Sequence, residues 1–153
     1  AAFLFSKKHK LPTFELADML AIAAPVGLFF GRIANFINGE LYGRVSDVSW
    51  AVIFPNGGPA PRHPSQIYEP FLEGLLLFII MMLLKQPKLG QKPGFLTGLF
   101  FVGYALARGF VELFRQPDDY LGFLVGGATM GQLLSLPMII IGAYLMARAA
   151  KQK

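Results

Sequence analysis

The fold of this chain is decided by one stretch, which reads LAIAAPVGLFF over residues 20–30 and GRIANFINGELYGR over residues 31–44. The first part is apolar, and the second places two arginines, two asparagines, one glutamate and three glycines within fourteen residues. Ionised groups at the end of a membrane-spanning helix must be paired or hydrated, because leaving them bare in lipid is costly. The stretch therefore predicts a membrane helix that ends at a polar cavity or a polar ligand.

The composition of the whole chain supports this prediction. The 153 residues are 54% hydrophobic and 15% charged, whereas soluble domains average about 25% charged residues. The net charge is +5, but most basic residues flank apolar segments and do not form a patch with aromatic platforms, so we expect no nucleic-acid partner. The chain reads as an integral membrane protein.

The lack of cysteine and the scarcity of histidine limit the chemistry that this chain can perform. The chain has no cysteine, which excludes disulfides, thiolate metal sites and a cysteine nucleophile within it. It has only two histidines, too few for a histidine-based metal cluster. We therefore expect no metal and no cofactor.

Apolar segments of membrane-spanning length predict an all-α integral membrane protein, a polytopic bundle with about four transmembrane helices in one transmembrane domain, residues 1–153. The expected spans are residues 16–37, 67–84, 94–114 and 130–147. Residues 38–65 form a non-cytoplasmic loop, in which residues 49–54 are a candidate short strand. A short apolar run ends at Lys7 and is interpreted as the tail of an earlier span, so we expect a C-terminal portion of a longer protein.

The basic residues predict the orientation of the bundle. They fall in three groups on one side of an alternating four-span topology: Lys7, Lys8 and Lys10; Lys85, Lys88 and Lys92; Arg148, Lys151 and Lys153. Under the positive-inside rule that side is cytoplasmic, and so is the C-terminus. The opposite side receives residues 38–65 and 115–128.

The third expected span carries polar residues on one face. Tyr104, Arg108, Glu112 and Arg115 follow at spacings of four, four and three, which stack on a helix. Arg108 lies roughly 10 Å inside the span at about 1.5 Å per residue, where an unpaired arginine costs about 2.5 kcal/mol or more. The face is interpreted either as an Arg108–Glu112 pair within the helix or as part of a functional site.

The second expected span places Gln66, Glu69 and Glu73 on one face. Glu69 is close to the helix start and is interpreted as a hydrated helix end. Glu73 lies deeper and needs a partner, for which an arginine of another helix is the obvious candidate.

In the opening stretch, Arg32, Asn35 and Gly39 share a face if the helix continues that far. Asn35 and Asn38 can both donate and accept hydrogen bonds, and glycines such as Gly39 and Gly43 let the backbone approach a ligand closely. The alternative is a polar helix–helix contact followed by a glycine-rich exit.

Two arginines on different helices suggest a chemistry. Arg32 and Arg108 both lie near the same water–lipid boundary, and guanidinium groups match the oxygens of a phosphate, such as that of an anionic phospholipid. Such a pair can stabilise charge on a departing phosphate, and Glu40 can orient an arginine or accept a proton. The same arginines would also suit half of an anion or lipid transporter, or a purely structural bundle.

Three blocks of the sequence resemble a known family. They read GRIANFINGELYG over residues 31–43, RHPSQIYE over residues 62–69 and RGFVELFRQPD over residues 108–118. The first resembles the signature of the bacterial prolipoprotein diacylglyceryl transferases, and the other two resemble further blocks of that family. Order and spacing are kept over essentially the whole chain.

The resemblance implies an activity. Such enzymes transfer the diacylglyceryl group of phosphatidylglycerol to the lipobox cysteine thiol of preprolipoproteins, so that a thioether forms and glycerol phosphate leaves. This is the first step of bacterial lipoprotein maturation. The implied partners are phosphatidylglycerol, preprolipoprotein signal peptides and membrane lipid. The implied location is the bacterial cytoplasmic (inner) membrane, with the active face toward the periplasm.

The resemblance also implies functional roles for individual residues. The key arginine of the signature falls on Arg32 and the second on Arg108, while the signature asparagine, glutamate and last glycine fall on Asn35, Glu40 and Gly43. With the faces described above, the expected catalytic residues are Arg32, Arg108 and Glu40. The expected substrate-binding residues are Arg32, Asn35, Asn38, Gly43, Glu112 and Arg115.

The chain departs from the family in two ways. Tyr42 stands where many members carry Trp. The family also has an N-terminal half with further spans, a His-Gly-Gly loop and an essential Tyr, which no residues here match, and His63 is not assigned that histidine's role. We expect this piece to be inactive alone.

Overall fold

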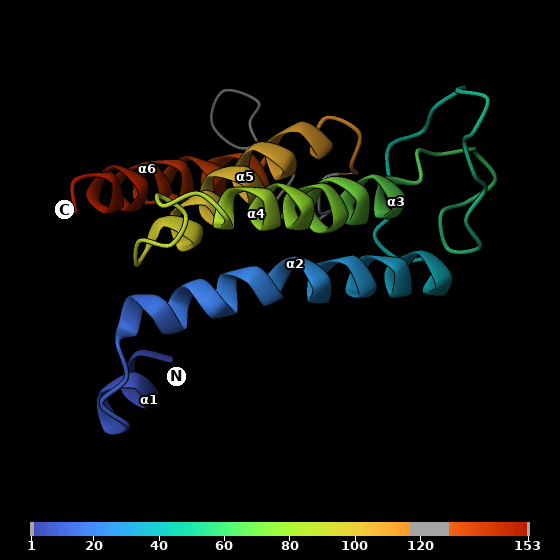
Figure 1. Ribbon diagram of the computed structural model, residues 1–153. Helices are drawn as coiled ribbons and strands as arrows, with labels where there is room; N and C mark the ends of the chain where they lie inside the picture. Colours follow the sequence, from blue (N-terminus) through green and yellow to red (C-terminus); the bar gives the residue numbers. More distant parts are fainter. Residues whose placement is uncertain (1, 117–128, 153) are drawn as a thin grey trace.

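The computed structural model describes residues 2–116 and 129–152, and all regular secondary structure in these residues is helical (Figure 1). The prediction of an all-α protein is confirmed. The elements are α1 (Ala2–Lys8), α2 (Thr13–Asn38), α3 (Ser65–Glu69), the π-helix η1 (Pro70–Leu76), α4 (Leu77–Lys85), α5 (Phe95–Val111) and α6 (Met130–Ala150).

Three of the helical segments are long and apolar enough to cross a membrane: Thr13–Asn38, Ser65–Lys85 and Met130–Ala150. The chain is accordingly an integral membrane protein with several spans. Helix α5 is apolar but has 17 residues, about 25 Å at 1.5 Å per residue. It begins at Phe95 and ends at Val111, inside the bounds expected for the third span.

The segment Ser65–Lys85 runs without a break through α3, η1 and α4. The change of register begins at Pro70, which has no N–H and so removes one bond of the α-helical ladder. Glu69 is the last residue of α3, and Glu73 lies within η1. π-helical turns inside α-helices occur often at functional sites, and this one carries Glu73 and directly follows Glu69.

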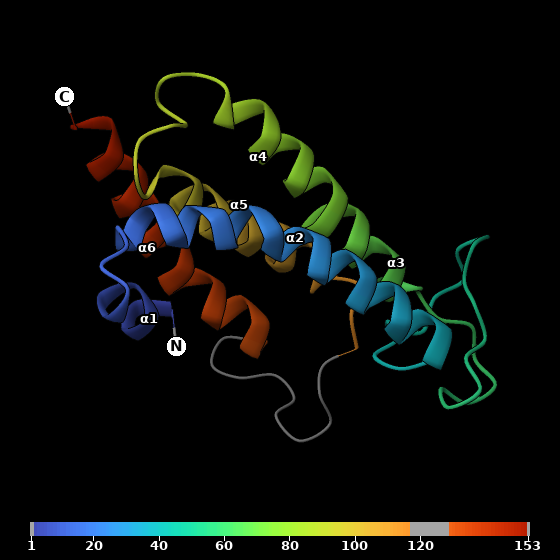
Figure 2. The ribbon, with the colours of Figure 1, turned by 60° about the horizontal axis from the view of Figure 1, so that its bottom comes forward.

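The long helices run alongside one another, with both chain termini at one end and the loop 39–64 at the other (Figures 1 and 2). Helices α5 and α6 pack closely at Gly98 and Gly142, where a Cβ on either residue would lie 2.6–2.8 Å from the nearest atoms of the other helix. Small residues let membrane helices pack backbone to backbone.

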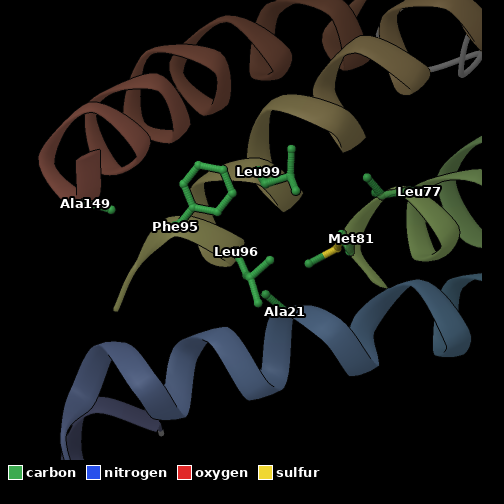
Figure 3. Packing of buried hydrophobic residues seen from close by; sticks show 7 residues of the cluster. All are labelled: Ala21, Leu77, Met81, Phe95, Leu96, Leu99 and Ala149. Carbon is green, nitrogen blue, oxygen red and sulfur yellow. The ribbon is translucent and has the colours of Figure 1, made fainter. Parts of the chain in front are cut away.

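The apolar core lies between the long helices and includes Ala149 near the C-terminal end of α6 (Figure 3). It joins α2, α4, α5 and α6 through Ala21, Leu77, Met81, Phe95, Leu96, Leu99 and Ala149. The buried acidic residues of α3 and η1 lie toward the loop end. The two ends of the bundle are therefore held by different forces.

The strand expected at residues 49–54 is not confirmed, and no strand is present in residues 2–116 or 129–152. In the loop, the described residues form only isolated antiparallel β-bridges. These pair Val45 with Arg62, Val52 with Arg62 and Gly43 with Arg115. Prolines at 55, 59 and 61 interrupt this region, and proline cannot donate to a ladder. The greater part of the expected connection 115–128 lies outside the described residues.

At the terminal end, Asp18 of α2 caps a different helix. Its Oδ2 accepts from the Gly94 N–H and its Oδ1 from the Thr97 N–H, both at 2.7 Å, and Oδ1 also accepts from the Thr97 hydroxyl at 2.6 Å. These N–H groups belong to the first turn of α5, which leaves its first donors without partners in the helix. Asp18 therefore ties α2 to α5.

We predict that Asp18→Ala lowers the free energy of unfolding by about 1–2 kcal/mol, because it removes a helix cap inside the bundle. Thermal unfolding of the full-length protein in detergent checks this. The control is Glu15→Ala on the exposed side of the same helix, which should shift the midpoint little. Equal shifts in the two variants would contradict the capping role.

Candidate active site

At the loop end, three arginines and three glutamates form one buried cluster. Arg32 belongs to the last turns of α2, Glu69 and Glu73 to α3 and η1, and Arg108 to the last turn of α5. Glu112 and Arg115 follow directly after α5. The formal charges of the six side chains cancel, which is what burial among apolar helices requires.

The structure brings Arg32 and Arg108 together on one carboxylate. Nε of Arg32 lies 2.9 Å from Oε2 of Glu69, and Nη1 of Arg108 donates a hydrogen bond of 2.9 Å to Oε1 of the same residue. The Glu69 side chain is 0% exposed, against 18% for Arg32 and 11% for Arg108. The interpretation of Glu69 as a hydrated helix end is therefore wrong.

Glu73 lies deeper in the same cluster. Its Oε2 is 3.8 Å from Nη2 of Arg32 and its Oε1 is 3.8 Å from Nη1 of Arg108. Neither oxygen accepts a hydrogen bond from the described residues. The cations nearest to Glu73 are thus arginines of other helices, as the sequence predicted. They lie within ion-pair distance but form no hydrogen bond with it.

Arg108 also pairs with its own helix neighbour. Its Nη2 lies 3.1 Å from Oε2 of Glu112, and Nη1 of Arg115 lies 3.9 Å from that same oxygen. The intrahelical pair and the contact with Glu69 therefore coexist. A Cβ on Gly131, in the first turn of α6, would lie 2.8 Å from Oε2 of Glu112, so the positive end of the α6 dipole faces this carboxylate.

A cavity of about 640 Å³ adjoins the cluster. Arg32, Asn35 and Tyr104 are its polar lining, and the rest is apolar: Ala24, Gly27, Leu28, Gly31, Phe100 and Met138. A Cβ on Gly27 or Gly31 would meet nothing within 4 Å, so this face of α2 is open. The cavity combines an apolar wall with one end at a guanidinium group.

The remaining predicted residues of the opening stretch lie at the cluster's edge. Asn38 is the last residue of α2 and is exposed. Glu40 is also exposed, and its carboxylate forms no ion pair with any residue that the structure describes. Its backbone carbonyl instead accepts a 2.7 Å hydrogen bond from Nε2 of Gln66. The functional roles of both residues stay predictions.

Gly39 and Gly43 of this stretch meet requirements of backbone conformation and packing. Gly39 caps α2 in the left-handed conformation with φ +67°, which glycine adopts without cost. Gly43 donates to the His63 carbonyl at 2.9 Å. A Cβ on Gly43 would lie 2.5 Å from that carbonyl oxygen and 2.6 Å from the Phe114 carbonyl oxygen. Close approach of protein backbone explains the glycine at 43.

Sequence reasoning did not assign the residues that hold the loop over the cluster. Arg44 donates from Nε to the Arg115 carbonyl at 2.9 Å. Arg62 donates to the carbonyls of Gly57 and Gly43 and stacks over the Tyr42 ring. Arg62 stands in one of the family-like blocks, so a signal existed, but its contacts with Gly43 and the Tyr42 ring depend on how the loop folds.

A second group joins the loop to α3. The Tyr68 hydroxyl accepts from Nε1 of Trp50 at 2.7 Å and lies 3.1 Å from Nδ1 of His63. The rings of His63 and Tyr68 both pack edge-on against Phe114. His63 is thus held within an aromatic group beside the end of α5.

Fold and site together define a class: a helical integral membrane protein with several spans, whose buried charges gather beside a cavity at one end. The family model described as prolipoprotein diacylglyceryl transferase matches residues 1–148. The chain belongs to this family.

The chain is similar to several curated relatives named phosphatidylglycerol–prolipoprotein diacylglyceryl transferase. The protein of Allorhizobium ampelinum is 56% identical over 99% of this chain and 53% of the relative. Those of Azospirillum brasilense and Rhodospirillum rubrum are each 54% identical over 99% of this chain and over 58% and 57% of the relatives. The chain therefore spans about half the length of these relatives.

We predict that Gly43→Ala lowers the free energy of unfolding by about 1–3 kcal/mol, because the added methyl group overpacks two backbone carbonyls. Denaturation of the full-length protein in detergent measures this. Gly109→Ala in α5, where a Cβ would meet nothing within 4 Å, is the control. A neutral Gly43→Ala would show that the loop backbone can move apart freely.

Proposed function

We propose that this chain forms the paired-arginine part of an enzyme that transfers the diacylglyceryl group of phosphatidylglycerol to the lipobox cysteine of preprolipoproteins. The observation that carries the proposal is the convergence of Arg32 and Arg108, from two helices, on one carboxylate beside an apolar cavity. The names of the relatives support the substrate pair.

The reaction explains why two guanidinium groups are useful. The cysteine sulfur forms a bond to the glyceryl carbon, the bond between that carbon and the phosphate oxygen breaks, and its electron pair leaves with glycerol phosphate. The thiol proton is released. Negative charge therefore grows on the phosphate, and donors fixed in advance stabilise it as it develops. Guanidinium groups match phosphate oxygens in pairs.

The cavity supports a lipid as the bound molecule. Its apolar lining suits an acyl chain, and its polar end at Arg32 and Asn35 suits the head group joined to that chain. Arg32 and Arg108 then act on the phosphate, while Asn35 and Asn38 contribute to binding near the head group and Gly43 contributes indirectly, through the loop backbone that packs closely against it. Glu112 and Arg115 flank Arg108, and Glu40 accepts a proton or orients an arginine.

We further propose four spans, with α5 as the third, in the bacterial cytoplasmic (inner) membrane. The basic residues support a cytoplasmic C-terminus, since Lys92 donates to the carbonyl of Gln152 and Arg148 lies over the Phe14 ring at the terminal end. The cluster at the opposite end then faces the periplasm. Half of an anion or lipid transporter is the alternative, and the names of the relatives do not favour it.

Substitution of Arg32 tests the proposal. We expect Arg32→Ala and Arg32→Lys in the full-length protein to lower transfer at least about a hundredfold, because a lysine offers one compact charge in place of a planar donor pair. Transfer from phosphatidylglycerol to a lipobox peptide in proteoliposomes is the measurement. The control is Arg148→Lys at the far end. Near-normal transfer by both Arg32 variants would contradict the proposal.

Filling the cavity provides a second test. Gly31→Leu adds bulk where no atom lies within 4 Å, so we expect a folded protein whose KM for phosphatidylglycerol rises several-fold. Val26→Phe adds bulk to α2 away from this cavity and is the matched control. Unchanged kinetics in Gly31→Leu would show that the lipid lies elsewhere.

A further inference from the structure

We propose that Glu69 is the positioning residue of the paired-arginine site, because its carboxylate fixes Arg32 and Arg108 in the orientation in which both meet one phosphate. The inference rests on the proposed function and adds a residue outside the set assigned above. Glu69 acts through the arginines, since its own side chain is completely buried.

The two oxygens of Glu69 serve different helices. Oε1 accepts from Nη1 of Arg108 in α5, and Oε2 is in close contact with Nε of Arg32 in α2, both at 2.9 Å. Because the oxygens of one carboxylate have a fixed separation, the two guanidinium groups are fixed relative to each other. Arg32 contacts Glu69 through Nε, its Nη2 lies 3.8 Å from Oε2 of Glu73, and the residue also lines the cavity.

Neither neighbouring glutamate makes this connection. Glu73 is 3.8 Å from each arginine, beyond hydrogen-bond distance. Glu112 pairs with Arg108 and Arg115, which both belong to the α5 side of the cluster. Among the ion pairs within residues 2–116 and 129–152, Glu69 is the carboxylate that lies 2.9 Å from both Arg32 and Arg108.

The backbone that carries Glu69 is itself anchored. Within α3, Gln66 donates from Nε2 to the Glu40 carbonyl at 2.7 Å, and the Ser65 hydroxyl donates to the Leu41 carbonyl at 3.2 Å. Both acceptors follow directly after α2. The start of α3 is therefore held against the end of the helix that supplies Arg32, so Glu69 is presented at a defined depth.

Whether Glu69→Gln tightens or weakens anion binding distinguishes a positioning role of Glu69 from an effect of its charge alone. Glu69→Gln removes one negative charge, which by Coulomb attraction alone would tighten anion binding. An amide, however, has one acceptor end and one donor end, so it can satisfy one guanidinium group but not both. Positioning therefore predicts weaker binding despite the more positive cluster.

The experiment measures glycerol phosphate binding to the full-length protein in nanodiscs that lack phosphatidylglycerol, by calorimetry. We expect Glu69→Gln to weaken binding about tenfold or more, the scale of a lost hydrogen bond to a charged group. The matched variant Glu73→Gln makes the same change from carboxylate to amide four residues further along the continuous helical segment Ser65–Lys85. It should leave affinity unchanged or improve it, because it breaks no close contact.

Tighter binding in Glu69→Gln, or equal shifts in the two variants, would overturn the inference. Where Glu69→Gln does not give folded protein, Glu69→Asp keeps the charge and shortens the reach by one methylene. It should also weaken binding, and wild-type affinity in this variant would likewise count against positioning.

A parallel transfer assay separates this inference from the proposed function. If the unaltered protein binds glycerol phosphate in a Glu69-dependent way but never modifies a lipobox peptide, the proposed function fails and the positioning role stands. If it modifies the peptide, while Glu69→Gln and Glu73→Gln bind glycerol phosphate alike, only the positioning role fails.

Discussion

Neutralisation of charge inside an apolar bundle is the constraint on which this structure depends. Each arginine or glutamate of the cluster would be costly to bury alone, and removing one partner of a buried pair typically costs about 3–5 kcal/mol. The three arginines and three glutamates therefore have to be assembled together. Because they come from α2, from α3 with η1, and from the end of α5, their assembly fixes these elements relative to one another at the loop end.

The two ends of the bundle illustrate two ways of holding helices together in a membrane protein. At the terminal end, the helices are held by apolar packing around Met81 and by the cap from Asp18 to α5. At the loop end, the helices are joined by charged side chains with capacity for further hydrogen bonds. The contacts at the terminal end thus join α2 and α5 independently of the charged contacts at the loop end.

Hydropathy and helical spacing predicted much of this. The positions of the long helices follow from apolar length, and the common face of Arg108, Glu112 and Arg115 follows from spacings of four and three. Spacing within one helix could not predict that a residue is buried by segments far away in the sequence. Glu69 stands near a helix start, where water is the usual neighbour, yet the end of α2 and the end of α5 cover it completely.

Two further residues show the same limit. Asp18 looks like an ordinary acid near the start of its own helix, but its partners at Gly94 and Thr97 are 76 and 79 residues away. Gly43 looks like a place for a ligand, but carbonyls of His63 and Phe114 occupy the space beside it. In both cases a tertiary contact that no local pattern encodes determines what the residue does.

A cluster with no net formal charge is well suited to the proposed reaction. Two unpaired arginines would bind the phosphate of the lipid strongly before any bond had broken, and equal binding of substrate and transition state does not accelerate chemistry. Carboxylates that share the guanidinium groups reduce this ground-state attraction while keeping the donors oriented. As the bond from carbon to oxygen breaks, the phosphate gains charge, and the attraction to the fixed N–H groups grows with it. A neutral, oriented cluster therefore favours the departing phosphate over the bound lipid.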